Sequence, residues 1–441
     1  MLQTGFARTD ITPFLGEALA GYFHFRAAEG VLDPLLATVV AFDDGEKRAL
    51  LISIDNIGMS QQYCDELRNA VGKAACCPAE GVFLACTHTH LGPEVTNTRV
   101  EVECDEYKAY LLHRLTDASV MAVRDLAPTE MYYTHSEVKD VAFIRRFRMK
   151  DGTVRTNPGW QNPEIDHPIG TPDEDASLLI LKREGKPEIG LVHFQVHPDV
   201  IGGNLISADY PAFVRNTYEQ MIENSHCIYI NGAQGDTNHI DVRLCRSNLS
   251  RGYERAAYMG KKIALSLIAN YSQAQKLEGS RVDFGQKNIF VGYNKEKCPK
   301  NIAEAQRIYK RYLETGSEAL AVPEFSGMSM MCTTKVAEAE RIVTLMDLPD
   351  EKELYLTALR VGEWALAGFP GEPFTAIGRA VKQESPFVLT MTACCANGEE
   401  GYFPTEDCFE DYCYETATAN YEKETSTRIV AGTLELLQSL K

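Results

Sequence analysis

Hydrophobic runs of strand length alternate along the chain with segments whose apolar residues recur at helical spacing. Residues 37–42, 49–54 and 81–86 are runs of the first kind, and residues 61–75 are a segment of the second kind. The same rhythm returns further along the chain. It predicts an α/β fold of layered mixed β-sheets flanked by helices, with the catalytic loops at the strand ends.

Histidines follow two of the hydrophobic runs directly. His88 and His90 come after residues 81–86, and His197 comes after residues 189–196. Residues two apart on an extended backbone share a face, so His88 and His90 can reach one ion, or one can bind it while the other holds a substrate. The threonines beside them can bond the remaining ring nitrogens. The alternative is that both are ordinary polar residues at a strand end.

A carboxylate and a phenol occur at two further junctions of this kind. Residues 369–372 open a predicted helix at Glu372, and Tyr402 lies in a loop after residues 387–395. Two histidines and a carboxylate suit zinc in an open catalytic site, where the ion lowers the pKa of water or polarises a carbonyl. Residue types alone leave this a hypothesis, because ten histidines allow many such sets.

The segment 141–148 ends in three arginines, Arg145, Arg146 and Arg148. They suit either a solvated strand end or a clamp for an anion or a carbonyl group, and the pattern alone favours the solvated strand end. Residues 151–176 are rich in Gly, Pro, Asn and Asp. They predict a long loop of the kind that often carries function.

Composition excludes several classes of function. The net charge of −18 opposes binding to nucleic acid, and no run approaches the roughly 18 apolar residues of a membrane span. The first residues lack the pattern of a signal peptide. Thirteen cysteines without a CxxC pair favour free thiols in a reducing compartment over disulfides or a zinc finger. We therefore expect a cytoplasmic protein without a transmembrane segment, while the oligomeric state stays open.

A chain of 441 residues can form one large domain or several. Residues 280–345 differ in texture from the rest, because strands there alternate with two charged helices, and they can form a second lobe or a lid. No linker composition forces a division. We expect one domain over residues 1–441, with possible lobes at 1–275 and 276–441.

Several short motifs occur together in one order. They are Asp10-Ile11-Thr12-Pro13, Gly21-Tyr22, Asp33-Pro34-Leu35, Thr87-His88-Thr89-His90-Leu91-Gly92-Pro93, Val196-His197-Pro198, Gly232-Ala233-Gln234-Gly235-Asp236, Pro370-Gly371-Glu372 and the stretch 402–415. They span almost the whole chain, and through them the sequence resembles the neutral, non-lysosomal ceramidase family. The resemblance implies a zinc-dependent hydrolase that cleaves the amide bond of an N-acyl, ceramide-like small molecule.

The resemblance also implies roles for individual residues. The positions that match the family's zinc ligands are His88, His197, Glu372 and Tyr402. Tyr414 matches a phenol that stabilises the oxyanion of the reaction. His90 and Arg145 match residues that contact the substrate near the scissile amide, and Arg146 competes with Arg145 for that role.

One position departs from the family's pattern. The family's nucleophilic serine stands two residues after the Asp of a Gly-Asp-x-Ser-Pro motif, and that position is Asn238 here. An amide side chain cannot accept an acyl group as that serine does, so we expect zinc-activated water to attack the substrate. Candidate bases are Asp236, His239 and Glu372, which the sequence does not rank. We also expect no C-terminal immunoglobulin-like domain of the kind that the family carries.

Three functions stay open at the level of sequence. The first is an amidohydrolase acting on ceramide-like N-acyl compounds. The second is a zinc hydrolase acting on a small polar N-acyl sugar or amino compound, which the acidic composition and the lost serine favour. The third is a catalytically inactive, metal-containing binding protein. Tyr414 and Arg145 argue against the third, because a structural zinc site needs neither.

Overall fold

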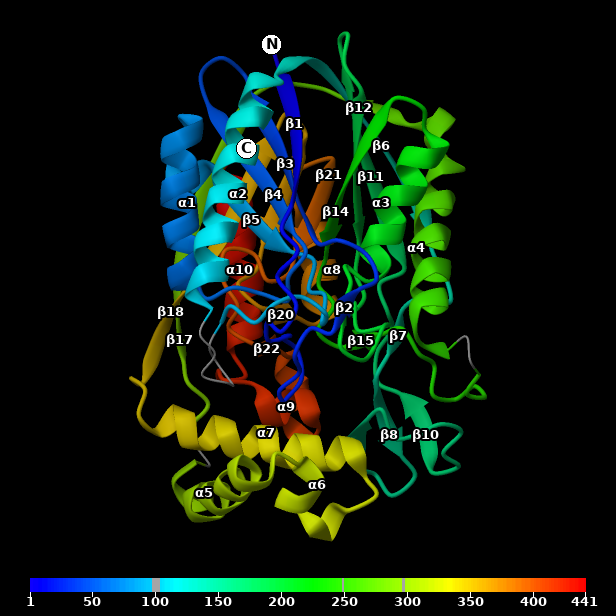
Figure 1. Ribbon diagram of the computed structural model, residues 1–441, viewed down its shortest axis with the longest axis vertical. Helices are drawn as coiled ribbons and strands as arrows, with labels where there is room; N and C mark the ends of the chain where they lie inside the picture. The colour runs from blue at the N-terminus through cyan, green and yellow to red at the C-terminus, as the bar shows by residue number, and fades with distance from the viewer. Residues whose placement is uncertain (97–103, 248–249, 296–297) are drawn as a thin grey trace.

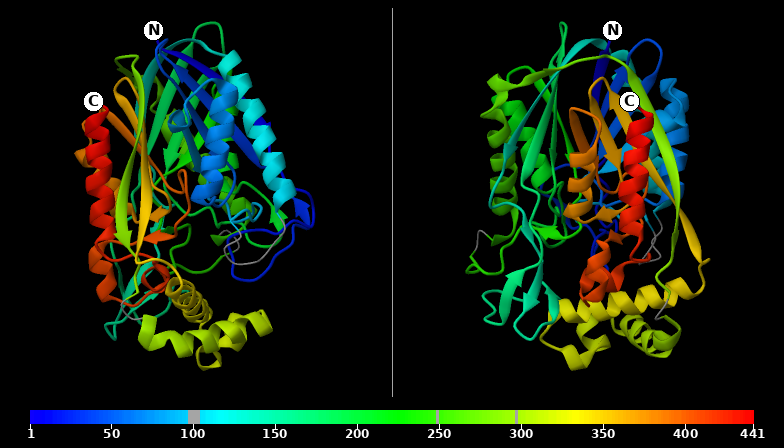
Figure 2. Two further views of the ribbon diagram at one scale, coloured as in Figure 1. Left: turned by 90° about the vertical axis from the view of Figure 1, so that its left-hand side faces the viewer. Right: turned by 180° about the vertical axis from the view of Figure 1, so that it is seen from behind.

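The protein forms four layers in the order helix, sheet, sheet, helix (Figure 2). The computed structural model describes residues 1–96, 104–247, 250–295 and 298–441. Among these residues, no helix combines the length and the hydropathy that crossing a bilayer requires. The predicted α/β fold of layered mixed sheets flanked by helices is confirmed.

The larger sheet has nine strands in the order β14-β12-β11-β6-β1-β3-β4-β5, with β16 paired to β6. The strands are β1 (Gln3–Asp10), β3 (Leu36–Asp43), β4 (Arg48–Ile54), β5 (Val82–Cys86), β6 (Ala127–Glu137), β11 (Asp175–Arg183), β12 (Glu188–Phe194), β14 (Ser225–Asn231) and β16 (Gln275–Leu277). Two of its strand pairs are parallel, β4 with β5 and β12 with β14.

The smaller sheet has four strands in the order β17-β18-β19-β21. They are β17 (Val282–Gly292), β18 (Glu351–Val361), β19 (Trp364–Gly368) and β21 (Leu389–Ala393), of which β19 and β21 are parallel. Side chains from the facing surfaces of both sheets, among them Phe42, Leu179 and Trp364, form one buried cluster. The apolar runs of the sequence are therefore strands that are covered on both faces.

Helices cover the outer face of each sheet (Figure 1). The larger sheet carries α1 (Gln61–Ala75), α2 (Asp105–Arg124), α3 (Tyr210–Met221) and α4 (Tyr253–Ile268), and the smaller sheet carries α8 (Thr375–Glu384) and α10 (Thr425–Ser439). The predicted helix at residues 61–75 is confirmed. It starts at Ser60, whose hydroxyl accepts a hydrogen bond from the backbone N–H of Tyr63.

A group of helices lies across the end of the molecule opposite to the chain termini (Figures 1 and 2). We call it the helical cap, and it consists of α5 (Cys298–Thr315), α6 (Glu318–Ala321) and α7 (Ser329–Met346). These helices share a hydrophobic cluster of their own, which includes Phe23, and Tyr414 packs against it. Residues 280–345, where the sequence pattern differs from the rest of the chain, thus contain strand β17 followed by this cap.

Two local predictions are wrong. Residues 151–176 are not one loop, because β9 (Val154–Thr156) and β10 (Ile165–Pro168) pair with β8 (Arg146–Met149). Glu372 does not open a helix. It lies in β20 (Glu372–Pro373), which pairs with β22 (Tyr402–Phe403), and α8 begins only afterwards. In both cases a strand from a distant part of the chain forms hydrogen bonds with the backbone N–H and C=O groups, and the local sequence does not reveal this partner.

The three parallel strand pairs within the two main sheets place their carboxyl ends at one common edge. Backbone hydrogen bonds connect these ends across the two sheets, from Cys86 N to the carbonyl of Cys395 at 3.3 Å and from Cys394 N to the carbonyl of Asn231 at 3.0 Å. The loops that follow the parallel strands leave from this edge. In α/β proteins the carboxyl edge of a parallel pair is where ligands bind.

Asp55, at the end of β4, ties this edge to the helices. Its carboxylate accepts two hydrogen bonds from the Arg215 guanidinium of α3, at 2.9 and 2.6 Å. It also accepts the backbone N–H of Leu36 at 2.9 Å and the hydroxyl of Thr87 at 3.2 Å. Removing one partner of such a buried pair is costly, because the other charge then has no partner.

We expect Arg215→Met to lower the free energy of unfolding by about 3–5 kcal/mol, because Asp55 keeps its buried charge without a cation. Urea unfolding followed by circular dichroism measures the loss. Lys276→Met is the control, since it removes only a partly exposed partner of Glu130 on the surface. Equal losses in the two variants would contradict the structural importance of the buried pair.

Candidate active site

His88 and His90 lie in the loop after β5. The strand ends at Cys86, and His88 has a φ of 72°, a left-handed conformation that is uncommon outside glycine. The prediction that the two residues share a face of an extended backbone is therefore wrong. The turn at His88 nevertheless brings the rings together, with their centroids 5.1 Å apart and their planes at 82°.

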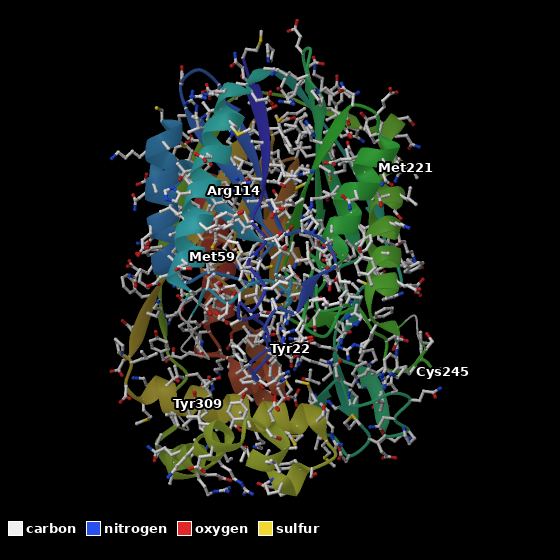
Figure 3. The ribbon with its side chains drawn as sticks, viewed as in Figure 1. Tyr22, Met59, Arg114, Met221, Cys245 and Tyr309 are labelled. Carbon is white, nitrogen blue, oxygen red and sulfur yellow. The ribbon has the colours of Figure 1, made fainter. Side chains whose placement is uncertain are left out.

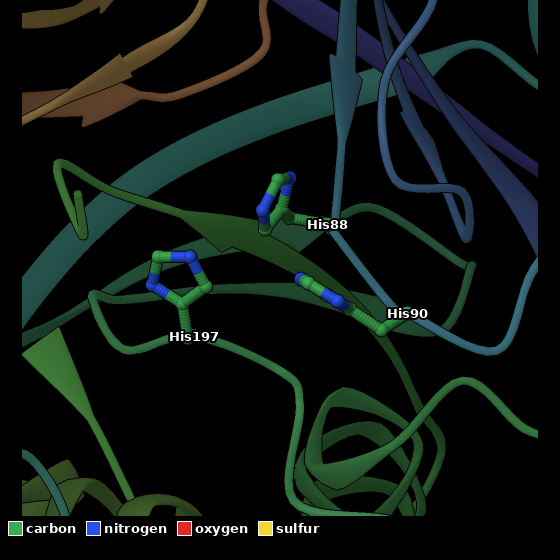
Figure 4. A group of neighbouring side chains, drawn as sticks. All are labelled: His88, His90 and His197. Atoms are coloured by element: carbon green, nitrogen blue, oxygen red, sulfur yellow. The ribbon is translucent and has the colours of Figure 1, made fainter. Parts of the chain in front are cut away.

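Other strand ends bring His197, Glu372 and Tyr402 to the same place. The centroid of the His197 ring lies 5.1 Å from that of His88. Strand pairing sets Glu372 directly opposite Tyr402. Figure 4 shows the imidazoles of His88, His90 and His197 converging from two separate segments of the chain. The structure thus brings together the four residues that the sequence suggested as metal ligands.

Three distances among the donor atoms of these four residues match the spacing of zinc ligands. Oε2 of Glu372 lies 3.3 Å from Nε2 of His88 and 3.0 Å from Nε2 of His197. The Tyr402 hydroxyl lies 3.5 Å from Nε2 of His197. Atoms bound at about 2.0–2.1 Å to a tetrahedral zinc ion are themselves about 3.3 Å apart. All four side chains are buried, so the donor set fits such an ion.

Backbone carbonyls orient two of the predicted ligands, His88 and His197. Nδ1 of His88 lies 2.7 Å from the carbonyl oxygen of Ile57, and Nδ1 of His197 lies 3.1 Å from that of Gln234. A ring N–H on Nδ1 must point at each carbonyl, so that the Nε2 atoms face Glu372. This arrangement presents both imidazoles in the tautomer that a metal requires.

The neighbouring threonines support the scaffold instead. The hydroxyl of Thr87 donates to Asp55, and the hydroxyl of Thr89 donates to the carbonyl oxygen of Ser207 at 2.7 Å. The prediction that threonines fix the imidazole tautomers is therefore wrong. The left-handed turn at His88 directs them to other partners.

The buried carboxylate of Glu372 carries a negative charge that nearby positive charge must compensate. Burial lowers the pKa of His88, but the Glu372 carboxylate outweighs burial and raises this pKa to about 9. Burial raises the pKa of Glu372, yet the two imidazoles hold it well below its usual range. Burial lowers the pKa of His197 to about 4, with the Arg145 charge acting in the same direction. Protonated His88 compensates the Glu372 charge, and a bound cation can replace that proton.

His90 adds a third imidazole to the group. The ligand nitrogens of His88, His90 and His197 all lie within 4.8 Å of one another. Neither ring nitrogen of His90 has a hydrogen-bond partner in the described part of the chain. Gly21 closes over this ring with a φ of 98°, and a Cβ there would lie 2.6 Å from Nδ1 of His90. His90 is therefore held in position yet able to bond a ligand.

Arg145 lies against two tyrosines of the site. Its Nε donates to Glu415 at 2.6 Å, and its Nη2 donates to the carbonyl of Gly235 at 2.7 Å. Its guanidinium carbon lies 5.2 Å from the centre of the Tyr402 ring and 6.0 Å from that of Tyr414. Burial lowers the pKa of Arg145, but Tyr402 and Glu415 raise this pKa by a larger amount, so the guanidinium stays charged.

Arg146 has different neighbours. Its Nη1 donates to Sγ of Cys408 at 2.8 Å, and its guanidinium lies 5.4 Å from the Phe374 ring. Both Arg145 and Arg146 are buried, so the prediction of a solvated strand end is wrong for these two residues. Of the pair, Arg145 is the one that lies over Tyr402.

Asp236 holds the start of α8. One of its oxygens accepts the backbone N–H of Thr375 at 2.8 Å, and the other accepts the Thr375 hydroxyl at 3.2 Å. Burial raises the pKa of Asp236. A carboxyl group in this position satisfies a free N–H at the helix terminus. Both oxygens of this candidate base are therefore already engaged.

Asn238 ends the short strand β15 (Thr237–Asn238), and His239 follows it. The Asn238 amide donates to the side-chain oxygen of Asn157 at 2.7 Å and accepts the backbone N–H of Ile240 at 3.0 Å. His239 is buried, and neither of its ring nitrogens has a partner among the described residues. Burial lowers the pKa of His239 to about 3, so its ring is neutral near pH 7.

Sequence reasoning missed two residues that hold the site. Gln234 donates through its side chain to Oε2 of Glu372 at 3.2 Å, while its carbonyl holds His197. Glu415 bonds the buried arginine and also accepts the Thr156 hydroxyl at 2.7 Å. Both lie inside the sequence motifs quoted above, which is the signal that could have found them.

Two other features lie close by. On the far side of His88, Sγ of Cys395 is 3.3 Å from Nδ1, and Glu399 completes a group with metal-ligand spacing. A separate cavity of about 1300 Å³ beside the helical cap is lined largely by polar and charged residues such as Glu338 and Arg341. None of the predicted site residues is among the described residues that line this cavity, so it is not the candidate active site.

Solved structures of similar fold support the architecture. The structure of a neutral ceramidase from Pseudomonas aeruginosa matches with a TM-score of 0.75 at 16% sequence identity, covering 100% of this chain and 74% of that chain. A ceramidase complexed with C2 matches with a TM-score of 0.71 at 15% identity, covering 100% of this chain and 75% of that chain. At such low identity the likeness shows the fold alone. No family model and no curated protein sequence matches the chain.

We expect Asp236→Ala to lower the free energy of unfolding by about 1–2 kcal/mol, because α8 loses its N-terminal hydrogen bonds. Chemical denaturation measures this loss, and elemental analysis of the same variant measures its metal content. A folded Asp236→Ala variant of unchanged stability would show that the carboxylate does not hold the helix.

Proposed function

We propose that this protein is a zinc-dependent amidohydrolase of the neutral ceramidase type, which cleaves the amide bond of an N-acyl, ceramide-like substrate. The spacing of the donor atoms of His88, His197, Glu372 and Tyr402 carries the proposal. The similarity in fold to two ceramidases supplies the substrate class. We treat residues 1–441 as one catalytic domain.

Zinc in this donor set would supply Lewis acidity toward the substrate carbonyl and would lower the pKa of water. The residues of the chain provide the rest of the site. The Ile57 and Gln234 carbonyls hold the imidazoles in the required tautomer. The Glu372 carboxylate supplies the negative charge that retains a cation, and burial keeps bulk water from screening it.

Tyr414 and Arg145 orient the substrate in this proposal. The Tyr414 ring lies 5.8 Å from the Tyr402 ring, centroid to centroid, on the side that Arg145 also contacts. A phenol and a guanidinium both donate hydrogen bonds, so they can stabilise the oxygen that gains negative charge when the amide carbon is attacked. Neither ring nitrogen of His90 has a partner among the described residues, so both can bond the substrate amide.

Water is the proposed nucleophile, because the amide of Asn238 cannot accept an acyl group. Hydrogen bonds to Asn157 and Ile240 support a role for Asn238 in holding the turn. Of the candidate bases, Asp236 is engaged with helix α8, and the Glu372 carboxylate belongs to the proposed donor set, so the proposal assigns the role of base to neither of them.

A second candidate is the same chemistry on a small polar N-acyl sugar or amino compound. It is favoured by Tyr22, whose ring lies 5.8 Å from that of His90 and whose hydroxyl bonds the Asp199 carboxylate. In both cases the partner is a small molecule rather than nucleic acid. All cysteines are free and all but Cys76 and Cys245 are buried, which supports a reducing, cytoplasmic location.

We expect the wild-type protein to retain one zinc per chain and Glu372→Gln to retain none, because the neutral amide removes the charge that holds the ion. Elemental analysis of protein purified without chelators or a histidine tag measures this. Glu219→Gln, which changes a carboxylate paired with Arg8, is the matched control. One zinc per chain in the Glu372→Gln variant would contradict the assignment of Glu372 as a zinc ligand.

We expect Tyr414→Phe to lower kcat about 100-fold, because the oxyanion loses a hydrogen-bond donor. Asn238→Ala should lower kcat less than about tenfold, since water rather than this side chain attacks. Release of fatty acid from an N-acyl substrate measures both, with zinc content checked in each variant. A loss in Asn238→Ala as large as that in Tyr414→Phe, at unchanged zinc, would argue against direct attack by water.

A further inference from the structure

A group of buried side chains beside Tyr414 takes no part in the mechanism above. It consists of Arg146, Cys408 and Cys413, and we call it the Arg146 cluster. Cys408 lies in the short helix η5 (Glu406–Glu410), and Cys413 directly precedes Tyr414. A chemical change at these thiols therefore acts on the segment that carries a proposed substrate-orienting residue.

The charge of Arg146 has no carboxylate of its own. Its Nε and Nη2 atoms are buried, and neither has a hydrogen-bond partner among the described residues. Glu415 and Asp236 are close enough to sense this charge. Glu415 bonds the guanidinium of Arg145 at 2.6 Å, however, and both oxygens of Asp236 bond Thr375. Because buried charges are normally paired, the Arg146 guanidinium can still accommodate a further negative group.

The thiols of Cys408 and Cys413 are the groups that face this guanidinium. Nη1 of Arg146 donates to Sγ of Cys408 at 2.8 Å, and the Thr405 hydroxyl lies 3.0 Å from the same sulfur. Burial lowers the pKa of Arg146, but Cys413 and Cys408 raise this pKa by a larger amount. A sulfur with two donors beside it is stabilised when it becomes negative, because charged hydrogen bonds are the stronger ones.

The two thiols differ in how readily they ionise. Burial raises the pKa of Cys408, while the Arg146 charge and the Thr405 hydroxyl oppose this rise. Burial raises the pKa of Cys413 to about 11, and the Glu415 charge adds to the rise. Thiolates rather than thiols are the reactive form of cysteine, and a neighbouring cation favours them. Cys408 is therefore the thiol that the cluster activates, and Cys413 is a second thiol on the same guanidinium.

The segment that carries both cysteines lies along a cavity. Phe409, Asp411 and Tyr412 are among the residues that line the space of about 1300 Å³ beside the helical cap. The two cysteines are only 4% and 3% exposed, so large reagents do not reach them. Hydrogen peroxide is a small neutral molecule, and a slight movement of this segment admits it from the cavity.

We propose that Cys408 and Cys413 form a peroxide-sensitive site, at which hydrogen peroxide joins the two thiols in a disulfide. The Cys408 thiolate attacks one peroxide oxygen, the O–O bond breaks, and a sulfenic acid and hydroxide form. The Cys413 sulfur then attacks the sulfenic sulfur, and the hydroxyl group leaves with the thiol proton as water. In total two thiols are oxidised, and one peroxide is reduced to two molecules of water.

This chemistry is separate from the proposed amide hydrolysis. The unpartnered N–H groups of Arg146 can bond the oxygen of the sulfenic acid before Cys413 attacks. In a reducing compartment such a disulfide is transient, as is typical of redox-sensing thiols. The site thus couples the oxidation state of the surroundings to the segment that precedes Tyr414.

Mass spectrometry of the full-length wild-type protein tests the site. The protein is treated with a small molar excess of hydrogen peroxide, and the remaining thiols are alkylated. A protease that cleaves after glutamate then cuts at Glu410, between the two cysteines. We expect two peptides held together by a Cys408–Cys413 disulfide, which a dithiol reductant separates again.

Three variants identify the roles within the cluster. Arg146→Met should slow formation of the disulfide about tenfold or more, because the Cys408 thiolate loses its cation. Cys413→Ser should stop the reaction at a sulfenic acid on Cys408, which dimedone captures. Cys245→Ser is the matched control, because it removes an exposed thiol at the edge of the molecule (Figure 3), and it should leave the rate unchanged.

Separate alkylation of Cys408 and Cys413 after peroxide treatment would overturn the site. Linkage of either residue to Cys394 or Cys395 would also overturn it, as would an unchanged rate in a folded Arg146→Met variant. If that variant does not fold, Cys413→Ser decides, because a Cys408 without a dimedone adduct contradicts the first step. A Cys408–Cys413 disulfide in protein that cleaves no amide would support this site while the proposed hydrolase failed.

Discussion

Two β-sheets packed face to face bring their strand ends to one edge, and the candidate site depends on this alignment. Backbone hydrogen bonds from the last residues of β5 and β14 to the segment after β21 connect the sheets there. The parallel partners then direct their loops to the same place. Pairing of β20 with β22 sets Glu372 opposite Tyr402, and a slip of one residue would turn one of these side chains to the other face.

Buried charge is the second constraint on this edge. Glu372 lies between two imidazoles, Arg145 is bonded to Glu415, and the Asp55–Arg215 pair stands behind the first histidine loop. Each charge has lost its water and is compensated by named partners. Such pairs add little net stability, yet they fix the positions of the groups they join. The predicted metal ligands and Arg145 are thus held in fixed positions.

Several site residues were recognisable in the sequence because their signals are local. The run before His88, the His197-Pro198 strand exit and the motif at Pro370-Gly371-Glu372 are each contained in a few residues. Local patterns failed where a distant segment competes for the same atoms. Residues 151–176 contain strands because they pair with β8, and Thr87 bonds Asp55 rather than an imidazole.

The sequence by itself determined the layered α/β class and the helix at residues 61–75, since periodicity expresses them directly. Its motifs suggested the candidate metal ligands only through their resemblance to a known family. Tertiary structure alone decided that Arg145 rather than Arg146 lies over Tyr402, and that Asp236 holds helix α8. It also brought the Tyr22 hydroxyl to the Asp199 carboxylate, which lies far along the chain. These outcomes depend on contacts between segments far apart in the chain, whose geometry exists only once the two sheets have packed together.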